Sequence, residues 1–333
     1  MKKNSGPPNI IFSNNITKDS YTNGILDNTF IIFNSIYDLL YFIYSKRKSI
    51  ILYNLINNKK INEIKNAHNE DISNFRHYLD KTIKIDLVIS LSKNDNNIKL
   101  WNIKNLECLH NIKRINENGW LYSSCFLNDN NKTYIVTSNW SLGNSEYIKV
   151  FDLKGNKVKK INNSNDKTFF IDSYYDNNLL KNYIITSNKG YIKSYDYNNN
   201  KIFHKYCDDN DDDHTNLIIY NKNEIIQLID SCSEGTIRIW HFNTGELLNK
   251  IKIKNIDYGL TGICLWNDEY IFIGSQDKTI KLVEIKNGKI IKNLNGHTEC
   301  LICIKKIIHP IYGECLISQG RRYDQIKLWI NKN

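Results

Sequence analysis

The chain has 333 residues and a net charge of +10, from 45 Lys and Arg against 35 Asp and Glu. This length exceeds that of a usual single domain, although all-β domains can be this long. No apolar run typical of a signal peptide follows Met1, and the most apolar window, residues 30–44, is interrupted by Asn34, Ser35 and Asp38. These features argue against secretion and a membrane span, so we expect an intracellular protein, cytoplasmic or nuclear.

The predicted elements begin with an isolated apolar segment at residues 9–13. From residue 30 onward a short sequence motif recurs, as "DNNIKLW" at 95–101, "EGTIRIW" at 234–240 and "YDQIKLW" at 323–329. The equivalent closing positions are Tyr53, Trp101, Phe151, Tyr195, Trp240, Val283 and Trp329. They lie 43 to 50 residues apart, a period typical of β-propeller arrays.

Each unit divides into four strand-like runs. In the fifth unit these runs are residues 214–220, 224–231, 236–242 and 246–253, separated by Asn, Gly, Asp and Glu. No run has a sustained helical period, so almost no helix is expected. The seventh unit has only three runs before the sequence stops. We expect residues 9–13 to provide its missing strand and so to close the ring.

Successive side chains of the repeated motif alternate between the two faces of a strand. In the fifth unit Ile237 and Ile239 share one face, while Arg238 and Trp240 share the other. Both faces of a propeller blade are covered by neighbours, so we expect Trp240 to bury its ring against the adjacent blade. We expect Arg238 to lay its stem along the surface and to keep its charged head in solvent.

The repeated motif resembles the closing strand of the WD40 repeat, and the resemblance covers about residues 9–330. It implies an all-β fold, a seven-bladed β-propeller of four-stranded antiparallel blades. The expected organisation is an N-terminal tail at residues 1–8 and a single propeller domain at residues 9–333. The Trp-Asp dipeptide of the family does not occur, and Val283 replaces the tryptophan in unit six.

Two sets of residues follow the family's order of histidine, serine, aspartate and tryptophan. They are His297, Ser318, Asp324 and Trp329 in the seventh unit, and His68, Ser90, Asp95 and Trp101 in the second. The resemblance implies that each set is a structural hydrogen-bonded network that pins a turn to a strand.

No catalytic constellation is visible. The serine of the network lacks a G-x-S-x-G elbow, and no G-x-x-x-x-G-K-[ST] phosphate loop is present. Cys300 and Cys303 form a lone CxxC without a second ligand pair, which argues against zinc. We therefore expect a protein that is not an enzyme and has no catalytic residue, metal site or cofactor.

An acidic run at residues 208–213 joins the fourth unit to the fifth. Its spacing does not fit an EF-hand loop. The favoured interpretation is a solvated connecting loop, and the alternative is an acidic docking loop or a weak cation site.

The candidate partner-binding residues are bulky side chains in loops that emerge on one face of the propeller. They are Trp120, Trp140, Tyr258, Arg321, Arg322 and Tyr323. Aromatic and arginine side chains dominate binding hot spots, although an aromatic here could instead plug the channel mouth. The favoured function is a non-catalytic scaffold that binds one or more proteins or peptide segments on this loop face.

The positive charge leaves a second function open, an RNA-associated WD40 subunit of a ribonucleoprotein. The lysines, however, are distributed along the whole chain, which favours weak attraction to polyanions over a specific nucleic acid groove. A contiguous basic face would support RNA, and interspersed charges would support a protein partner.

Overall fold

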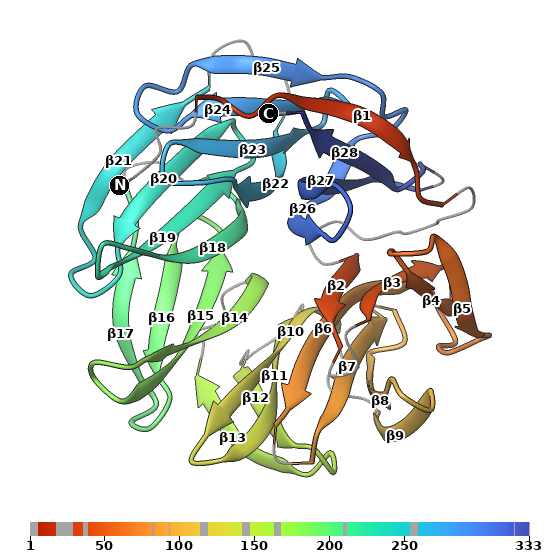
Figure 1. Ribbon diagram of the computed structural model, residues 1–333. Helices are drawn as coiled ribbons and strands as arrows, with labels where there is room; N and C mark the ends of the chain where they lie inside the picture. The colour runs from red at the N-terminus through yellow and green to blue at the C-terminus, as the bar shows by residue number, and fades with distance from the viewer. Residues whose placement is uncertain are drawn as a thin grey trace.

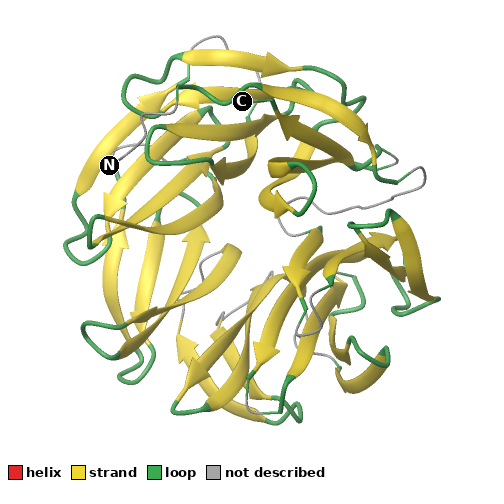
Figure 2. Cartoon of the chain, in the orientation of Figure 1, coloured by secondary structure: helices red, strands yellow, loops and turns green. Residues whose placement is uncertain are grey.

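The computed structural model describes residues 6–17, 29–35, 39–81, 83–92, 94–113, 119–141, 147–162, 168–208, 212–253, 259–322 and 324–332, with backbone alone at 119–120, 139–141 and 147. Every regular element in these residues is a β-strand, as Figure 2 shows. The strands form seven antiparallel sheets of four strands each, arranged as blades around a central opening (Figure 1). The predicted seven-bladed β-propeller is therefore confirmed.

The first four blades follow the chain in order. Blade one contains β2 (Phe30–Asn34), β3 (Leu40–Lys46), β4 (Ser49–Asn54) and β5 (Lys59–Ile64). Blade two contains β6 (Ile72–Asp80), β7 (Ile85–Ser92), β8 (Asn97–Asn102) and β9 (Glu107–Ile112). Blade three contains β10 (Gly119–Asp129), β11 (Lys132–Ser141), β12 (Tyr147–Asp152) and β13 (Lys157–Asn162). Blade four contains β14 (Thr168–Asp176), β15 (Lys181–Asn188), β16 (Ile192–Asp196) and β17 (Lys201–Tyr206).

The last three blades complete the ring. Blade five contains β18 (His214–Lys222), β19 (Ile225–Cys232), β20 (Thr236–His241) and β21 (Leu247–Lys252). Blade six contains β22 (Leu260–Leu265), β23 (Tyr270–Ser275), β24 (Ile280–Glu284) and β25 (Ile290–Leu294). Blade seven contains β26 (Leu301–His309), β27 (Gly313–Gly320), β28 (Lys327–Asn331) and, on its outer edge, β1 (Ile10–Asn15).

The N-terminal strand closes the ring, as predicted. β1 pairs antiparallel with β28, with Ile10 opposite Asn331 and Phe12 opposite Trp329. The pairing continues past the strand, because the backbone N–H of Ile16 donates to the carbonyl of Ile326 at 2.8 Å. In Figure 1 the red β1 accordingly lies beside the dark blue β28, although the two are at opposite ends of the sequence.

The core consists of seven apolar clusters, and each fills the interface between two neighbouring blades. The cluster between blades four and five contains Trp240 together with Tyr183 and Tyr206, as expected from the alternation pattern. A further cluster joins blade seven to blade one through Ile317 and Phe42. Because every blade is covered on both sides, apolar residues are needed on both faces of its strands.

Asparagine, abundant in the sequence, supplies tight turns. Asn130 and Asn131 join β10 to β11 and have φ values of 48° and 61°, the left-handed geometry of a two-residue hairpin loop. Asparagine tolerates this conformation better than most residues because its short polar side chain bonds locally.

No helix in the described part of the chain is long and apolar enough to span a membrane.

Candidate functional site

The β27–β28 turn of blade seven is held by a buried hydrogen-bonded chain. The indole Nε1 of Trp329 donates to Ser318 Oγ at 2.7 Å, and Ser318 Oγ lies 2.6 Å from His297 Nε2. His297 Nδ1 lies 2.7 Å from Asp324 Oδ2. Since the carboxylate can only accept, we place the histidine proton on Nδ1, so that Nε2 accepts from the serine hydroxyl. The four residues are thereby linked in one chain.

Burial and hydrogen bonding set the protonation of this chain. Burial lowers the pKa of His297, and the hydrogen bond to Asp324 only partly offsets that effect. Burial also tends to raise the pKa of Asp324, but the hydrogen bond from His297 and the backbone N–H of Glu299 outweigh it and leave the pKa below its usual value. A neutral histidine therefore faces an ionised aspartate at neutral pH.

Asp324 fixes the backbone of the turn as well. Its carboxylate accepts from the backbone N–H groups of Thr298 at 3.2 Å and Gln325 at 2.9 Å. A Cβ atom on Gly320 would collide with the side chain of Asp324, so glycine is needed at this position while Asp324 keeps its hydrogen bonds.

The turn presents two arginines to solvent. Arg321 and Arg322 are both exposed, and Arg322 has a left-handed φ of 54°. The backbone N–H of Arg321 donates to the carbonyl of Cys300 at 2.8 Å, and the carbonyl of Arg321 accepts from the N–H of Asp324 at 3.2 Å. The buried chain thus holds the backbone that carries both guanidinium groups.

Blade two contains a looser version of this chain. Ser90 Oγ lies 2.7 Å from His68 Nε2 and accepts from Trp101 Nε1 at 2.7 Å. Asp95 Oδ2 is 3.5 Å from His68 Nδ1 and accepts from the backbone N–H of Asn69 at 2.7 Å. At 3.5 Å the histidine–aspartate contact is an electrostatic one and not a short hydrogen bond.

The lowered histidine pKa predicts loss of stability on acidification. The unfolded chain binds protons on His297 near pH 6.5, whereas the folded chain does so only at lower pH. Below about pH 6.5 the unfolded state therefore binds more protons, and the free energy of unfolding falls as pH falls. Urea unfolding between pH 7.5 and 5.5 should show this slope, with a shallower slope in His297→Asn.

The matched control for this experiment is His110→Asn. It removes an imidazole from the outer strand β9 and leaves the hydrogen-bonded residues of blades two and seven unchanged. An unchanged slope in His297→Asn would contradict the prediction.

The aromatic residues predicted to bind a partner do not lie where the sequence analysis placed them, or lie outside the described residues. Trp120 and Trp140 stand on strands β10 and β11, directly opposite each other, and not in loops as expected. The prediction of loops was wrong because the hairpin of blade three continues through residues 119 and 141 after a bulge between Leu121 and Ser123. Tyr258 and Tyr323 lie outside the described residues.

Arg238 is fully buried, so the prediction of a solvent-exposed head was wrong. Its Nε lies 2.7 Å from Asp208 Oδ2 and its Nη2 lies 3.4 Å from Asp212 Oδ2. Both aspartates come from the acidic run at residues 208–213, which was expected to be a solvated loop. The side chains of Asp208 and Asp212 are only 11% and 6% exposed, because they neutralise an arginine that the neighbouring blades cover.

A third carboxylate completes this cluster. Asp230 accepts from Trp240 Nε1 at 2.6 Å and lies 2.7 Å from His214 Nδ1. Asp230 therefore bonds to a tryptophan indole and to a histidine, as Ser90 does in blade two and Ser318 in blade seven. The sequence contained a signal for it, because Asp230 precedes Trp240 by 10 residues, close to the 11 between Ser318 and Trp329.

His214, Asp230 and Cys232 are all buried, and their potential ligand atoms lie within 4.8 Å of one another. A metal ion is disfavoured here because the Nη1 of Arg238 contacts Cys232 Sγ and lies 3.9 Å from Asp230 Oδ2. Burial, followed by the charge of Asp230, raises the pKa of Cys232 far above its usual value, so the sulfur remains a thiol. The guanidinium occupies the place that a cation would need, and the cluster is an ion-paired structural network in which Lys250 supplies a second positive charge to Asp208.

No family model matches the chain. A similar solved structure is the crystal structure of Raptor from Chaetomium thermophilum, with a TM-score of 0.72 and 14% sequence identity. The match covers 97% of this chain but only 29% of the Raptor chain. At this identity the likeness supports the propeller fold alone.

Proposed function

We propose that the chain is a non-catalytic, WD40-type interaction scaffold that binds protein or peptide segments on the face carrying the β27–β28 turn. The observation that carries this proposal is that two exposed arginines, Arg321 and Arg322, stand on a backbone that is anchored by hydrogen bonds of Arg321. Two arginines on a turn whose backbone is already fixed lose less entropy on binding than arginines on a flexible loop. Guanidinium groups form paired, charge-assisted hydrogen bonds with carboxylates, so the proposed partner segment is acidic.

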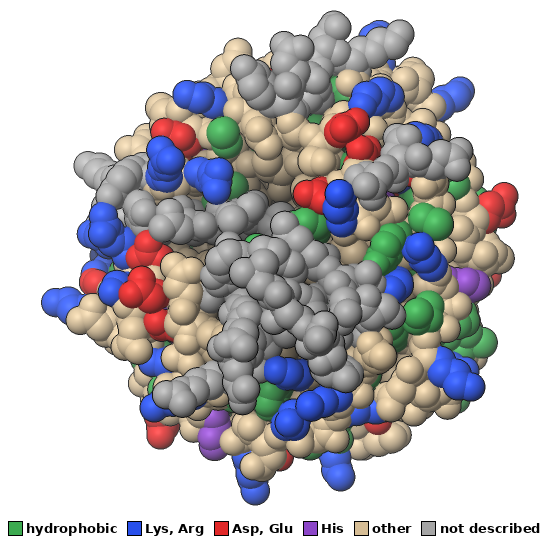
Figure 3. Space-filling model, turned by 180° about the vertical axis from the view of Figure 1, so that it is seen from behind, with side chains coloured by type: hydrophobic (Ala, Val, Ile, Leu, Met, Phe, Trp, Pro, Cys, Tyr) green, Lys and Arg blue, Asp and Glu red, His purple; other side chains and the backbone are tan. Residues whose placement is uncertain are grey.

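The distribution of charge on this face favours a protein over a nucleic acid. Figure 3 shows Lys and Arg side chains interspersed with Asp and Glu over the part of the face that it colours by type. Nucleic acid binding requires a contiguous basic stripe to release counterions. An RNA-associated role therefore has no specific support beyond the net charge of +10.

Blade three extends the proposed surface. Trp120 and Trp140 remain predicted contributors to a partner interface, and their backbones pair at the start of β10 and the end of β11. Tyr258 and Tyr323 remain predicted contributors, and an intracellular location remains part of the proposal.

The test is capture of partners by the purified chain and by an Arg321→Ala/Arg322→Ala variant. For an acidic segment identified by affinity purification, we expect the variant to weaken binding at least about tenfold, since each lost charge-assisted contact contributes on the order of 1 kcal/mol or more. The melting temperature should not change, because both side chains are exposed.

The matched control is Lys154→Ala/Lys286→Ala, which removes two exposed charges at the β12–β13 and β24–β25 turns of the opposite face. If this control weakens binding as much as the arginine variant does, the assignment of the face is wrong. A second variant, Trp140→Ala/Arg322→Ala, tests whether blade three takes part.

A further inference from the structure

The connection from β25 to β26 contains an Asn-Gly pair, Asn295 and Gly296, directly before His297 of the hydrogen-bonded residues of blade seven. In such a pair the backbone nitrogen of the glycine can attack the side-chain amide of the asparagine, because glycine has no Cβ to hinder the approach. The reaction is intramolecular, so its rate depends on how readily the two groups meet. Local structure therefore decides which Asn-Gly pairs of a folded chain react.

A second Asn-Gly pair, Asn287 and Gly288 in the β24–β25 turn, is held by hydrogen bonds. The backbone N–H of Gly288 donates to the carbonyl of Glu284 at 2.9 Å. The side-chain amide of Asn287 donates to Glu284 Oε2 at 2.5 Å and accepts from the backbone N–H of Lys289 at 2.8 Å. Both reacting groups of this pair are thus bound to other partners.

Asn295 and Gly296 lack such contacts. Both residues are exposed, and within the described residues neither the side-chain amide of Asn295 nor the N–H of Gly296 has a hydrogen-bond partner. The backbone nevertheless favours glycine at position 296, because φ there is 145°. Asn287 is exposed as well, so access of solvent does not distinguish the two asparagines. The difference between the pairs is their hydrogen bonding.

We propose that Asn295 deamidates spontaneously and that the isoaspartate so formed weakens blade seven. The nitrogen of Gly296 loses its proton to solvent and forms a bond to Cγ of Asn295. The Cγ–Nδ2 bond then breaks, and ammonia leaves with a proton taken from water. One water molecule opens the resulting succinimide ring. Opening at Cγ gives aspartate, whereas opening at the main-chain carbonyl carbon gives isoaspartate, in which the backbone runs through the side chain.

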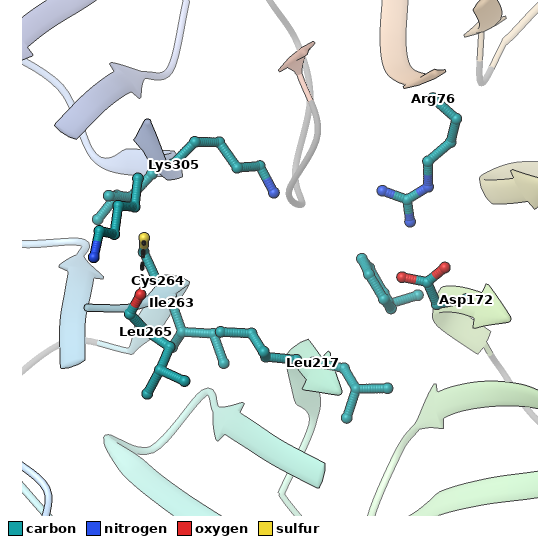
Figure 4. A pocket seen from close by; sticks show the side chains of 11 residues that line it. Arg76, Asp172, Leu217, Ile263, Cys264, Leu265 and Lys305 are labelled. Carbon is teal, nitrogen blue, oxygen red and sulfur yellow. Dashed lines mark hydrogen bonds between the residues drawn. The ribbon is translucent and has the colours of Figure 1, made fainter. Parts of the chain in front are cut away.

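The water that this reaction consumes reaches Asn295 from the outer surface. The cavity of the central channel, of about 300 Å³, is lined by residues of the inner strands that include Arg76, Asp172 and Lys305. Figure 4 shows Arg76 and Asp172 on one side of this cavity and Lys305 on the other. Asn295 instead follows the outermost strand of blade six, β25, and does not line the cavity. Its reaction is therefore independent of what the channel contains.

Isoaspartate at position 295 would add one methylene to the backbone between two anchored residues. Leu294 is buried in the cluster between blades six and seven. His297 Nδ1 lies 2.7 Å from Asp324 Oδ2. Because a packed interior does not stretch, the longer backbone must displace one of these anchors. This effect concerns stability and does not depend on the proposed binding of an acidic segment.

The first experiment compares the two pairs within one molecule. The full chain is incubated at neutral pH and digested with an endoproteinase that cleaves after glutamate. Cleavage after Glu284 and Glu299 releases residues 285–299, which contain both pairs, and mass spectrometry locates the deamidated residue. We expect Asn295 to react at least about tenfold faster than Asn287, because reaction at Asn287 first requires loss of hydrogen bonds worth about 1 kcal/mol each. A sample digested before incubation corrects for reaction during digestion.

The matched control is a synthetic peptide of residues 285–299. Without the fold its two Asn-Gly pairs should react at similar rates. Equal rates at Asn295 and Asn287 in the folded chain would overturn the proposal. A preference for Asn295 in the peptide as large as that in the folded chain would also overturn it, because the sequence and not the structure would then select the site.

The second experiment tests the effect on blade seven. The unaltered chain and Asn295→Gln are aged in parallel and unfolded in urea, so that reaction at the other asparagines is common to both. Glutamine reacts far more slowly because its ring closure is less favourable. We expect the urea midpoint to fall further in the unaltered chain, whereas fresh Asn295→Asp should unfold like the fresh unaltered chain. An equal fall in both aged proteins, despite isoaspartate at position 295, would show that the modification does not weaken blade seven.

Discussion

Replacing Arg238 with alanine is expected to lower the free energy of unfolding by about 3–5 kcal/mol. The substitution leaves the buried carboxylates of Asp212 and Asp230 without the guanidinium that lies 3.4 and 3.9 Å from them, while Asp208 keeps the ammonium of Lys250 at 2.7 Å. Uncompensated charge in a buried site is far more costly than the loss of the pair itself. Urea unfolding at neutral pH, followed by tryptophan fluorescence, measures the change.

The chain offers a matched control at the equivalent position of blade two. Lys99 lies opposite Ser90, as Arg238 lies opposite Asp230, and its Nζ donates to the carbonyl of Ala67 at 2.5 Å. Lys99→Ala should lower the free energy of unfolding by only about 1 kcal/mol, since it removes one hydrogen bond and leaves no buried carboxylate without its positive partner. If Arg238→Ala costs no more than this control, the cluster does not stabilise blade five as described.

A double-mutant cycle separates the charge effect from lost packing. Arg238→Ala combined with Asp212→Asn should lower the free energy of unfolding by less than the sum of the two single variants, because the second change removes a carboxylate that the first leaves uncompensated. Additive losses would instead assign the effect to packing of the arginine stem.

Ile10→Asp is expected to lower the free energy of unfolding by at least about 4 kcal/mol, because it deletes a core side chain and puts a charge in its place. Ile10 is fully buried in the cluster between blades six and seven, with Trp329 and Leu316. It belongs to the strand that closes the ring, so its loss also frees the edge of β28. Thermal unfolding and size-exclusion chromatography should show a lower melting temperature and self-association.

Phe12→Asp is the control on the same strand. Phe12 is 46% exposed and meets the ring of Trp329 edge-on at 5.5 Å. Losing this contact should cost about 1–2 kcal/mol. Equal effects of the two substitutions would mean that β1 is held by its backbone alone and that closure does not depend on burial of Ile10.

Much of the fold could be predicted from the sequence because it depends on local patterns. The period between Trp101, Trp240 and Trp329 and their equivalents determined the number of blades, and alternation determined which side chains enter the interfaces. The unmatched segment at residues 9–13 determined how the ring closes, because an unpaired edge strand needs a partner. Each of these features repeats or completes a pattern within the chain.

Side chains that meet across blades could not be predicted in this way. Arg238 is buried because Asp208 and Asp212 of the acidic run lie against it. The position of these two aspartates is set by the packing of blades four and five. The extent of the hairpin at Trp120 and Trp140 depended on a bulge that the sequence does not mark.

The sequence by itself therefore determined the repeat, the strand order and the closing strand, since these follow from period, alternation and turn residues along one chain. Only the tertiary structure decided which charges are buried and which face the channel. Arg76, Asp172 and Lys305 are far apart in sequence and share one cavity because the ring places equivalent strand positions around a common axis. Charge energies depend on distance and on exclusion of water, and both are set by the closed ring.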